Sequence, residues 1–469
     1  MTSTVTRRGP AGQPLPRTGP PDEPRGGRSG LAWLLDLPAN AVRGLRRSAA
    51  TTPGKLTLIG VALVVLSLLA GAVGSAAIGE RKGTIDGLID HREPLAAAAQ
   101  ELYRSLSDAD ATAASAFLST GAEPPELRQR YELDIATAGA ALAKAASDSG
   151  GVPEAAAQVD MLSRQLPVYT GLVETARANN RQGFPVGAAY LREASELMRA
   201  KILPAANELY EIDADRLAEE QDDAAGVPWL TALLALGLLG ALIAAQVYLK
   251  RKTNRVFNVG LGVATIAVGV AVLWTAAAVT VQSVLVSNAA EDGTGQADVL
   301  VRARITALQA RADETLTLVA RGGGEAYDNE FNELFGQLAG EDGRSGLLAQ
   351  ARERAEDLPS AEHVDSAVQN AVAWGAAHGQ VREFDNSGEY ERAVSLAIDT
   401  TDEQSAAAAF TRLDEDLAAA IGSGRQIFLD DTTNASRALT LLAPGFALLA
   451  LIAALGTTLG IRERLREYR

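Results

Sequence analysis

Four long runs without a charged residue constrain this chain more than any other feature. Each run holds about 20 residues or more, and a helix that rises about 1.5 Å per residue crosses a hydrocarbon core of about 30 Å over that length. The runs are Leu56–Ile78, Val227–Leu249, the core of Val256–Val286, and Ala438–Ile461. The sequence therefore predicts four transmembrane helices.

The charged residues between these runs are sorted by segment. Residues 79–226 hold 25 acidic and 14 basic side chains and residues 287–437 hold 28 and 12, whereas both termini and residues 250–255 are basic. Lys and Arg in short loops stay on the cytoplasmic side, because anionic lipids hold them there. We therefore expect a multi-pass protein of the plasma membrane with both termini in the cytoplasm and both acidic segments outside.

The short basic segment 250–255 is the candidate cytoplasmic interaction site. Its cations are Lys250, Arg251, Lys252 and Arg255. At about 1 kcal/mol per cation near an anionic surface, they fix the orientation of the second and third spans. Only Phe257 and Tyr468 accompany the basic clusters as stacking residues, whereas nucleic-acid grooves combine cations with aromatic side chains. We therefore expect contacts with the lipid bilayer or with protein, and no nucleic acid.

These segments give a complete map of the chain. The expected order is a disordered cytoplasmic tail (1–30), a basic juxtamembrane segment (31–55), a first span (56–78), a first extracytoplasmic helical domain (79–226), a second span (227–249), a cytoplasmic loop (250–255), a third span (256–286), a second extracytoplasmic helical domain (287–437), a fourth span (438–461) and a cytoplasmic tail (462–469). Cleavage of the first span as a signal peptide is the alternative, but 55 residues precede its 23 apolar residues, and a signal peptide has a short leading region.

Both acidic segments have the periodicity of helix bundles. In the first, apolar residues recur at spacings of three and four in four stripes, which "STGAEPP", "SDSGGVP" and "NNRQGFPVG" separate. The second repeats the plan, with breaks at "RGGGEAY", "GEDGRSG" and "DNSGEY", and weak local matches between the two suggest an internal duplication. The predicted fold class is an all-α membrane protein with four transmembrane helices and two extracytoplasmic four-helix-bundle domains in tandem. Pro167 and Pro204 fall inside two stripes, where we expect kinks.

The residues that carry chemistry are sparse. The chain has no cysteine, which excludes thiolate catalysis, iron–sulfur clusters and cysteine-based zinc sites. Its histidines, His91, His363 and His378, lack the spacing of metal ligands, and no phosphate-binding glycine motif is present. The acidic clusters "EEQDD" (219–223) and "LDEDL" (413–417) are typical of solvated helix faces and lack a calcium-loop pattern. We therefore expect no enzyme, metal or cofactor, and the ligand-binding residues stay unknown.

The layout of a membrane helix, a four-helix bundle and a second membrane helix, with "AFLSTGAEPPELRQRYELDIATAGAAL" as its first hairpin, resembles the periplasmic sensor modules of chemoreceptors and histidine kinases. The whole chain, with "YLREASELMRAKILPAANELY" in the fourth outer helix, is similar to the actinobacterial four-transmembrane signalling proteins. Those proteins work with a glutamate/aspartate-binding lipoprotein and protein kinase G. The resemblance implies a relay from a loaded binding protein outside to a kinase inside.

Two functions follow from these observations. The first is a non-enzymatic sensor that relays an extracytoplasmic ligand, or a ligand-loaded solute-binding lipoprotein, to a cytoplasmic partner such as a Ser/Thr protein kinase. The alternative is a structural or assembly factor of the cell envelope. No charged residue marks a route through the four runs, which weighs against a pump or coupled transporter. The oligomeric state stays open, with a homodimer as one candidate.

Overall fold

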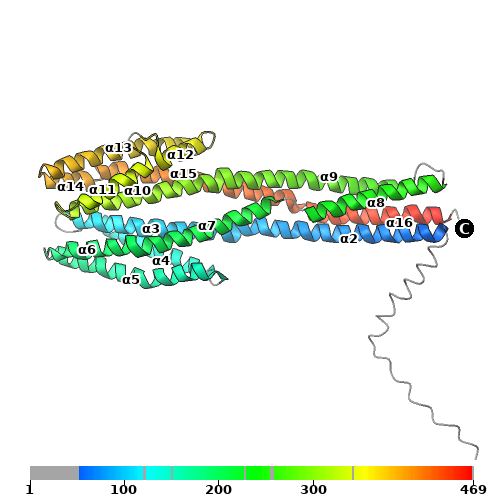
Figure 1. Ribbon diagram of the computed structural model, residues 1–469, viewed down its shortest axis with the longest axis horizontal. Coiled ribbons are helices and arrows are strands. Elements are labelled where there is room, and N and C mark those ends of the chain that lie inside the picture. Colours follow the sequence, from blue (N-terminus) through cyan, green and yellow to red (C-terminus); the bar gives the residue numbers. More distant parts are fainter. Residues whose placement is uncertain are drawn as a thin grey trace, which may run out of the picture. The chain divides into compact units, whose positions relative to one another are not determined.

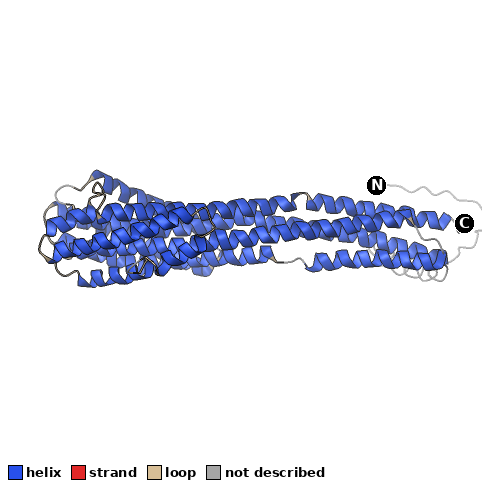
Figure 2. Cartoon of the chain, turned by 90° about the horizontal axis from the view of Figure 1, so that it is seen from above, coloured by secondary structure: helices blue, strands red, loops and turns tan. Residues whose placement is uncertain are grey.

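The structure is a computed structural model that describes residues 52–119, 123–148, 151–226, 229–253, 258–340 and 343–466. Every regular element in these ranges is a helix and none is a strand (Figure 2). Four helices there are long and apolar enough to cross a membrane, and each overlaps one of the predicted runs. The predicted all-α membrane fold is therefore confirmed. The predicted tail 1–30, most of segment 31–55 and Arg255 lie outside the described residues.

The chain divides into two compact units, Met1–Ala62 with Ile461–Arg469, and Leu63–Gly460. In the described part of the smaller unit, Gly60 lies against Ile461, and a Cβ atom on Gly60 would come within 2.6 Å of Ile461 Cδ1. The larger unit contains residues 79–226, called the first module below, and residues 287–437, called the second module.

In the first half of the chain, α2, η1 and α3 form one continuous helical rod, and α6, η3 and α7 form a second. Helices α4 and α5 lie between the two rods in the sequence (Figure 1). The elements of this half are α2 (Thr52–Gly87), the π-helical turn η1 (Leu88–Arg92), α3 (Glu93–Leu118), α4 (Pro125–Asp148), α5 (Pro153–Arg181), α6 (Val186–Leu197), the π-helical turn η3 (Met198–Ile202), α7 (Leu203–Ala225) and α8 (Trp229–Thr253). The π-helical turns keep each rod unbroken. The first membrane helix therefore runs directly into the first module.

The second half has the same plan with a more divided middle. Its elements are α9 (Val259–Asn288), the π-helical turn η4 (Ala289–Gly295), α10 (Gln296–Val319), α11 (Glu325–Leu338), α12 (Gly346–Ala355), α13 (Ala361–Asn386), α14 (Tyr390–Ile398), α15 (Ala406–Thr440) and α16 (Leu442–Arg466). The turns around Gly322, Gly340 and Gly388 have positive φ angles, which glycine adopts without steric cost. Asn258 caps the start of α9, because its Oδ1 accepts a hydrogen bond from Leu261 N.

The two modules share one hydrophobic core and are not independent tandem bundles. Helices α3 and α10 pack against each other, and buried residues of both modules form a single cluster (Figure 1). Almost every residue of α3 from Ser105 to Ala116 is buried. A helix with no wetted face lies inside a larger core. The long rods α3, α7, α10 and α15 therefore meet in the middle, with the shorter helices packed outside them.

Equivalent features occupy equivalent places in the two modules. The turns η1 and η4 end at Arg92 and Gly295. The same sequence separation relates Asp110 to Asp313, each within an Ala-Asp-x-Thr motif in the buried part of its helix. An internal duplication would produce this correspondence.

Polar side chains hold the end of α7 and the start of α16. Arg81 Nη2 and Gln282 Nε2 donate hydrogen bonds to Ala224 O at 2.7 and 2.9 Å, and without such donors the last carbonyl groups of a helix lack partners. Ser75 Oγ of α2 donates to Ala443 O in the first turn of α16 at 3.1 Å. Arg81 comes from α2 and Gln282 from α9, so both first rods contact the end of α7.

The prolines are accommodated in two ways. Pro167 lies inside α5. Pro204 and Pro94 instead follow π-helical turns, each as the second residue of the next helix. A proline ring clashes with the carbonyl four residues earlier in a regular α-helix, and the extra residue of a π-helical turn moves that carbonyl. The structure therefore shows at Pro204 a π-helical turn in place of a simple helix break.

Candidate functional site: a cavity where the four rods meet

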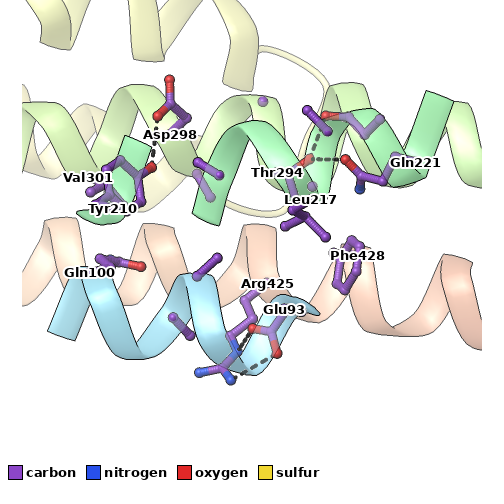
Figure 3. A pocket seen from close by; sticks show the side chains of 18 of the residues that line it. Glu93, Gln100, Tyr210, Leu217, Gln221, Thr294, Asp298, Val301, Arg425 and Phe428 are labelled. Atoms are coloured by element: carbon purple, nitrogen blue, oxygen red, sulfur yellow. Dashed lines mark hydrogen bonds and ion pairs between the residues drawn. The ribbon is translucent and has the colours of Figure 1, made fainter. Parts of the chain in front are cut away.

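A cavity of about 350 Å³ lies among α3, α7, α10 and α15, at the end of the shared core that joins the membrane helices. All four rods and the turn η4 line it (Figure 3). Ligand pockets in proteins commonly have volumes of about 300–1,000 Å³. This is therefore the candidate site, and every element that leads into a predicted span touches it or adjoins it.

The π-helical turn η4 brings backbone to the wall of the cavity. Gly293 faces α15 so closely that a Cβ atom there would lie 2.9 Å from Phe428 Cβ, so only glycine permits this approach. Thr294 and Gly295 complete the wall. A π-helical turn is an irregular helical segment that often occurs at functional sites. The helix that contains the third span therefore has its irregular turn at the wall of the cavity.

Apolar side chains make the interior of the cavity. Its deeper lining includes Ala96, Leu217, Val301, Ile421 and Phe428, all buried or partly buried. Such a lining gains free energy when it excludes water, at about 25 cal/mol per Å² of apolar surface. The interior therefore suits an apolar group.

Charged and hydroxyl groups lie at the margins of the cavity. Glu93 Oε1 pairs with Arg425 Nε at 2.5 Å on one side, and Asp298 pairs with Arg302 at 3.1 Å on the other. The Tyr210 hydroxyl donates to Asp298 Oδ1 at 2.8 Å (Figure 3). Burial raises the pKa of Tyr210, and the Asp298 carboxylate raises it further. Tyr210 is therefore a neutral hydroxyl at physiological pH, without the reactivity of a phenolate.

Gln221 is the polar residue that the cavity leaves incompletely bonded. Its side chain is 3% exposed, and its Oε1 accepts a hydrogen bond from Thr294 Oγ1 at 3.3 Å. Its Nε2 is buried and has no hydrogen-bond partner in the protein. A buried donor without an acceptor costs about 1–3 kcal/mol. A bound acceptor, from a ligand or a water molecule, would remove that cost.

The predicted interaction site lies elsewhere. Lys250 and Arg251 are exposed near the end of α8, and Lys252 belongs to the same helix. Arg255 falls outside the described residues. The structure therefore tests neither the docking role of these cations nor their side of the membrane.

Sequence reasoning missed the cavity, although a signal was present. The cluster "EEQDD" behaves as a solvated face except at Gln221, which points into the core. The segment "EDGTGQ" places Gly293 and Gly295 within an unbroken helical rod. Glycine in a helix interior costs about 1 kcal/mol relative to alanine, so two of them indicate close packing or function.

A second buried polar cluster lies within the second module. Glu314 accepts hydrogen bonds from Trp374 Nε1 at 3.2 Å and from Arg311. His378 contacts Glu314 through Nδ1 at 3.1 Å and Asp328 through Nε2 at 3.2 Å. Burial alone would lower the pKa of His378, but Asp328 and Glu314 raise it. Among the described residues, no group of histidines and carboxylates has an arrangement that could hold a metal ion.

Comparison with known families gave a match over the first module. Residues 84–222 match the model of an actinobacterial sensor domain. The matched segment runs from the end of α2 to α7, so it includes η1 and two walls of the cavity. Comparison with curated proteins and with solved structures gave no match. The sensor-domain match and the four apolar helices fit a membrane sensor of actinobacterial type.

Proposed function

We propose that the chain is a non-enzymatic transmembrane sensor in which the state of the cavity outside the membrane is relayed to a cytoplasmic partner. One observation carries the proposal. The first rod of each module continues without a break into a predicted span, and η4 on the second of these rods lines the cavity. The sensor-domain match over residues 84–222 supports the same function.

The mechanical connection runs through the end of α7. Arg81 and Gln282 belong to the first and third membrane rods and hold Ala224 O at the end of α7. A shift of α7 at the cavity would therefore change contacts of two rods that enter the membrane. Helix shifts of about 1–2 Å are an established form of allosteric switching, and coupling of about 1–3 kcal/mol between sites is typical.

The partners follow from the charge pattern and from the family resemblance. An extracytoplasmic solute-binding lipoprotein would act on the modules, and a Ser/Thr protein kinase would dock at the basic segment 250–255. If the modules do not communicate with the inner ends of the spans, a role in assembly of the cell envelope is the better account.

The absence of cysteine makes a direct test of communication possible. Two spin labels at Lys250→Cys and Leu459→Cys, both exposed positions, would report the distance between the ends of α8 and α16 in lipid nanodiscs. The substitution Ala214→Phe places a ring in the cavity as a substitute for a ligand. We expect it to shift the label distance by about 1–2 Å.

The control is Leu133→Phe, which adds a ring on an exposed face of α4 at a residue that is 64% exposed. We expect this variant to leave the distance unchanged. If a folded Ala214→Phe protein gives the same distance distribution as the parent, the modules do not communicate with the spans and the sensor proposal is wrong.

A further inference from the structure

We propose that the cavity binds a small, neutral or cationic amphipathic molecule that accepts a hydrogen bond from the Gln221 side-chain amide. This inference rests on the proposed function, because it names the ligand that the sensor would detect directly. It concerns a site in the modules themselves, separate from any binding protein that docks on them. Three properties of the cavity lead to this ligand class.

The first property is the charge at the margins. The lining contains four carboxylates, on Glu93, Asp215, Asp222 and Asp298, against two guanidinium groups, on Arg302 and Arg425. Each guanidinium already pairs with a carboxylate. The remaining charge is negative, and the exposed carboxylates of Asp215 and Asp222 repel an anion that approaches the cavity. The cavity therefore disfavours an anion such as a free dicarboxylic amino acid.

The second property is the combination of an apolar interior with one unused donor. Leu217 and Phe428 stand beside Gln221 (Figure 3), and the Gln221 Nε2 donor has no partner in the protein. Binding sites for small molecules typically combine apolar walls with a few polar groups that fix orientation. A carbonyl group attached to a short hydrocarbon matches both parts.

The third property is the route of entry. Asp215, Ala218 and Asp222 line the cavity and are exposed on α7. The cavity therefore opens to the aqueous phase on that side. Exposed carboxylates at this opening attract a cation and admit a neutral molecule, which agrees with the charge argument. A water-soluble amphipathic molecule can therefore enter without crossing the bilayer.

The test uses two probes that share a hydrocarbon body, hexanamide and hexanoate. Binding to the full chain in nanodiscs is measured by ligand-observed NMR, with empty nanodiscs of the same lipids to subtract partition into the bilayer. We expect hexanamide to bind at least about tenfold more tightly than hexanoate, a difference of about 1.4 kcal/mol. Ala214→Phe, which fills the cavity, should abolish the binding of both.

The variant that isolates the donor is Gln221→Glu, which keeps the shape of the side chain and removes the amide. We expect about tenfold weaker binding of hexanamide, whereas Gln182→Glu, at an exposed position, should have no effect. Gln221→Leu is a second variant in case the new carboxylate impairs folding, which circular dichroism would show.

Each remaining outcome overturns the inference. Equal binding of hexanoate would contradict the charge argument. Unchanged hexanamide binding in both Gln221 variants would mean that Gln221 Nε2 donates to a buried water molecule and not to the ligand. Failure of both probes to bind would exclude the ligand class. The spin-label experiment is independent of these results, because a distance change with Ala214→Phe keeps the sensor proposal even when both probes fail.

Discussion

The two modules share a plan but treat a buried carboxyl group in opposite ways. In the first module, Asp110 Oδ1 accepts hydrogen bonds from two hydroxyl groups, Tyr169 at 3.2 Å and Ser195 at 2.9 Å. In the second module, Glu314, one residue beyond the position equivalent to Asp110, is bonded to Arg311 and to the imidazole of His378. Burial excludes water from both carboxyl groups, so their partners decide their charge.

The pKa directions express this difference. Burial raises the pKa of Asp110, even though Arg199 and the two hydroxyl groups act in the opposite direction. Burial alone would also raise the pKa of Glu314, but Arg311 and His378 lower it below its ordinary value. The comparison teaches that one helical scaffold can shift a buried acid toward its neutral form in one half and toward its ionised form in the other. Neutral and charged hydrogen-bond networks differ most when one partner is removed.

The largest expected effect separates these two carboxyl groups. Glu314→Gln removes the charge that balances Arg311 and His378, and loss of one partner from a buried ion pair costs about 3–5 kcal/mol. Asp110→Asn puts a neutral group of the same shape where burial already disfavours the charge, so we expect a loss below about 1 kcal/mol. Hydrogen exchange of α10 and α13, against α3 and α5, would measure the two changes. Equal destabilisation by the two variants would contradict the opposite pKa directions of the two carboxyl groups.

Much of the fold could be predicted because hydropathy and charge can be read directly along the sequence. A count of consecutive apolar residues was enough to predict the four spans, and apolar residues at spacings of three and four predicted the helices of the first module. The sharing of one core could not be derived in this way. The segment "ADATAASA" of α3 (109–116) shows one apolar stripe in the sequence. Its remaining residues are small, so a second helix can approach them closely, and α10 packs against that face.

The functional groups were harder to predict because they meet only in the folded protein. His378 has no metal-ligand neighbour in sequence. Folding brings it to Glu314 and Asp328, which lie 64 and 50 residues away along the chain. The cavity likewise combines η4 with three other rods. A single sequence does not show which distant residues pair, although an Asp beside an apolar stripe, as at Asp313, is a signal that sequence reasoning can use.

A smaller effect is expected from the pH dependence at the junction of the modules. Asp313 forms an ion pair with Arg199 and also faces Asp110 and Glu330. Burial raises the pKa of Asp313 to about 7, although Arg199 opposes this rise. An acid whose pKa is raised on folding stabilises the protein at low pH, and its contribution is lost as pH rises from its unfolded pKa of about 3.9 to its folded pKa. His378, whose pKa is also raised, loses its contribution at higher pH still, above about 6.5.

We therefore expect the parent protein to be more stable at pH 5 than at pH 8. Asp313→Asn should flatten this dependence by about 2–3 kcal/mol, at 1.36 kcal/mol per pKa unit. Thermal unfolding across pH 4.5 to 8 would measure it, with Asp160→Asn as the matched control at a residue that is 61% exposed. An unchanged slope in Asp313→Asn would mean that Arg199 keeps this carboxylate ionised, and the junction would then resemble the network around Glu314.

The smallest expected effects are at the exposed ion pairs, where the two modules should behave alike. Arg164 pairs with Asp160 at 2.6 Å in the first module, and Arg392 pairs with Glu389 at 3.1 Å in the second. Water and salt screen such pairs, and ordering two long side chains offsets most of the attraction. Asp160→Asn and Glu389→Gln should each change stability by less than about 0.5 kcal/mol, measured by thermal unfolding at low and high salt. If both variants leave stability nearly unchanged, the two modules differ only in their buried hydrogen-bond networks. A loss of stability above about 1 kcal/mol in one variant alone would show that the exposed ion pairs of the two modules differ as well.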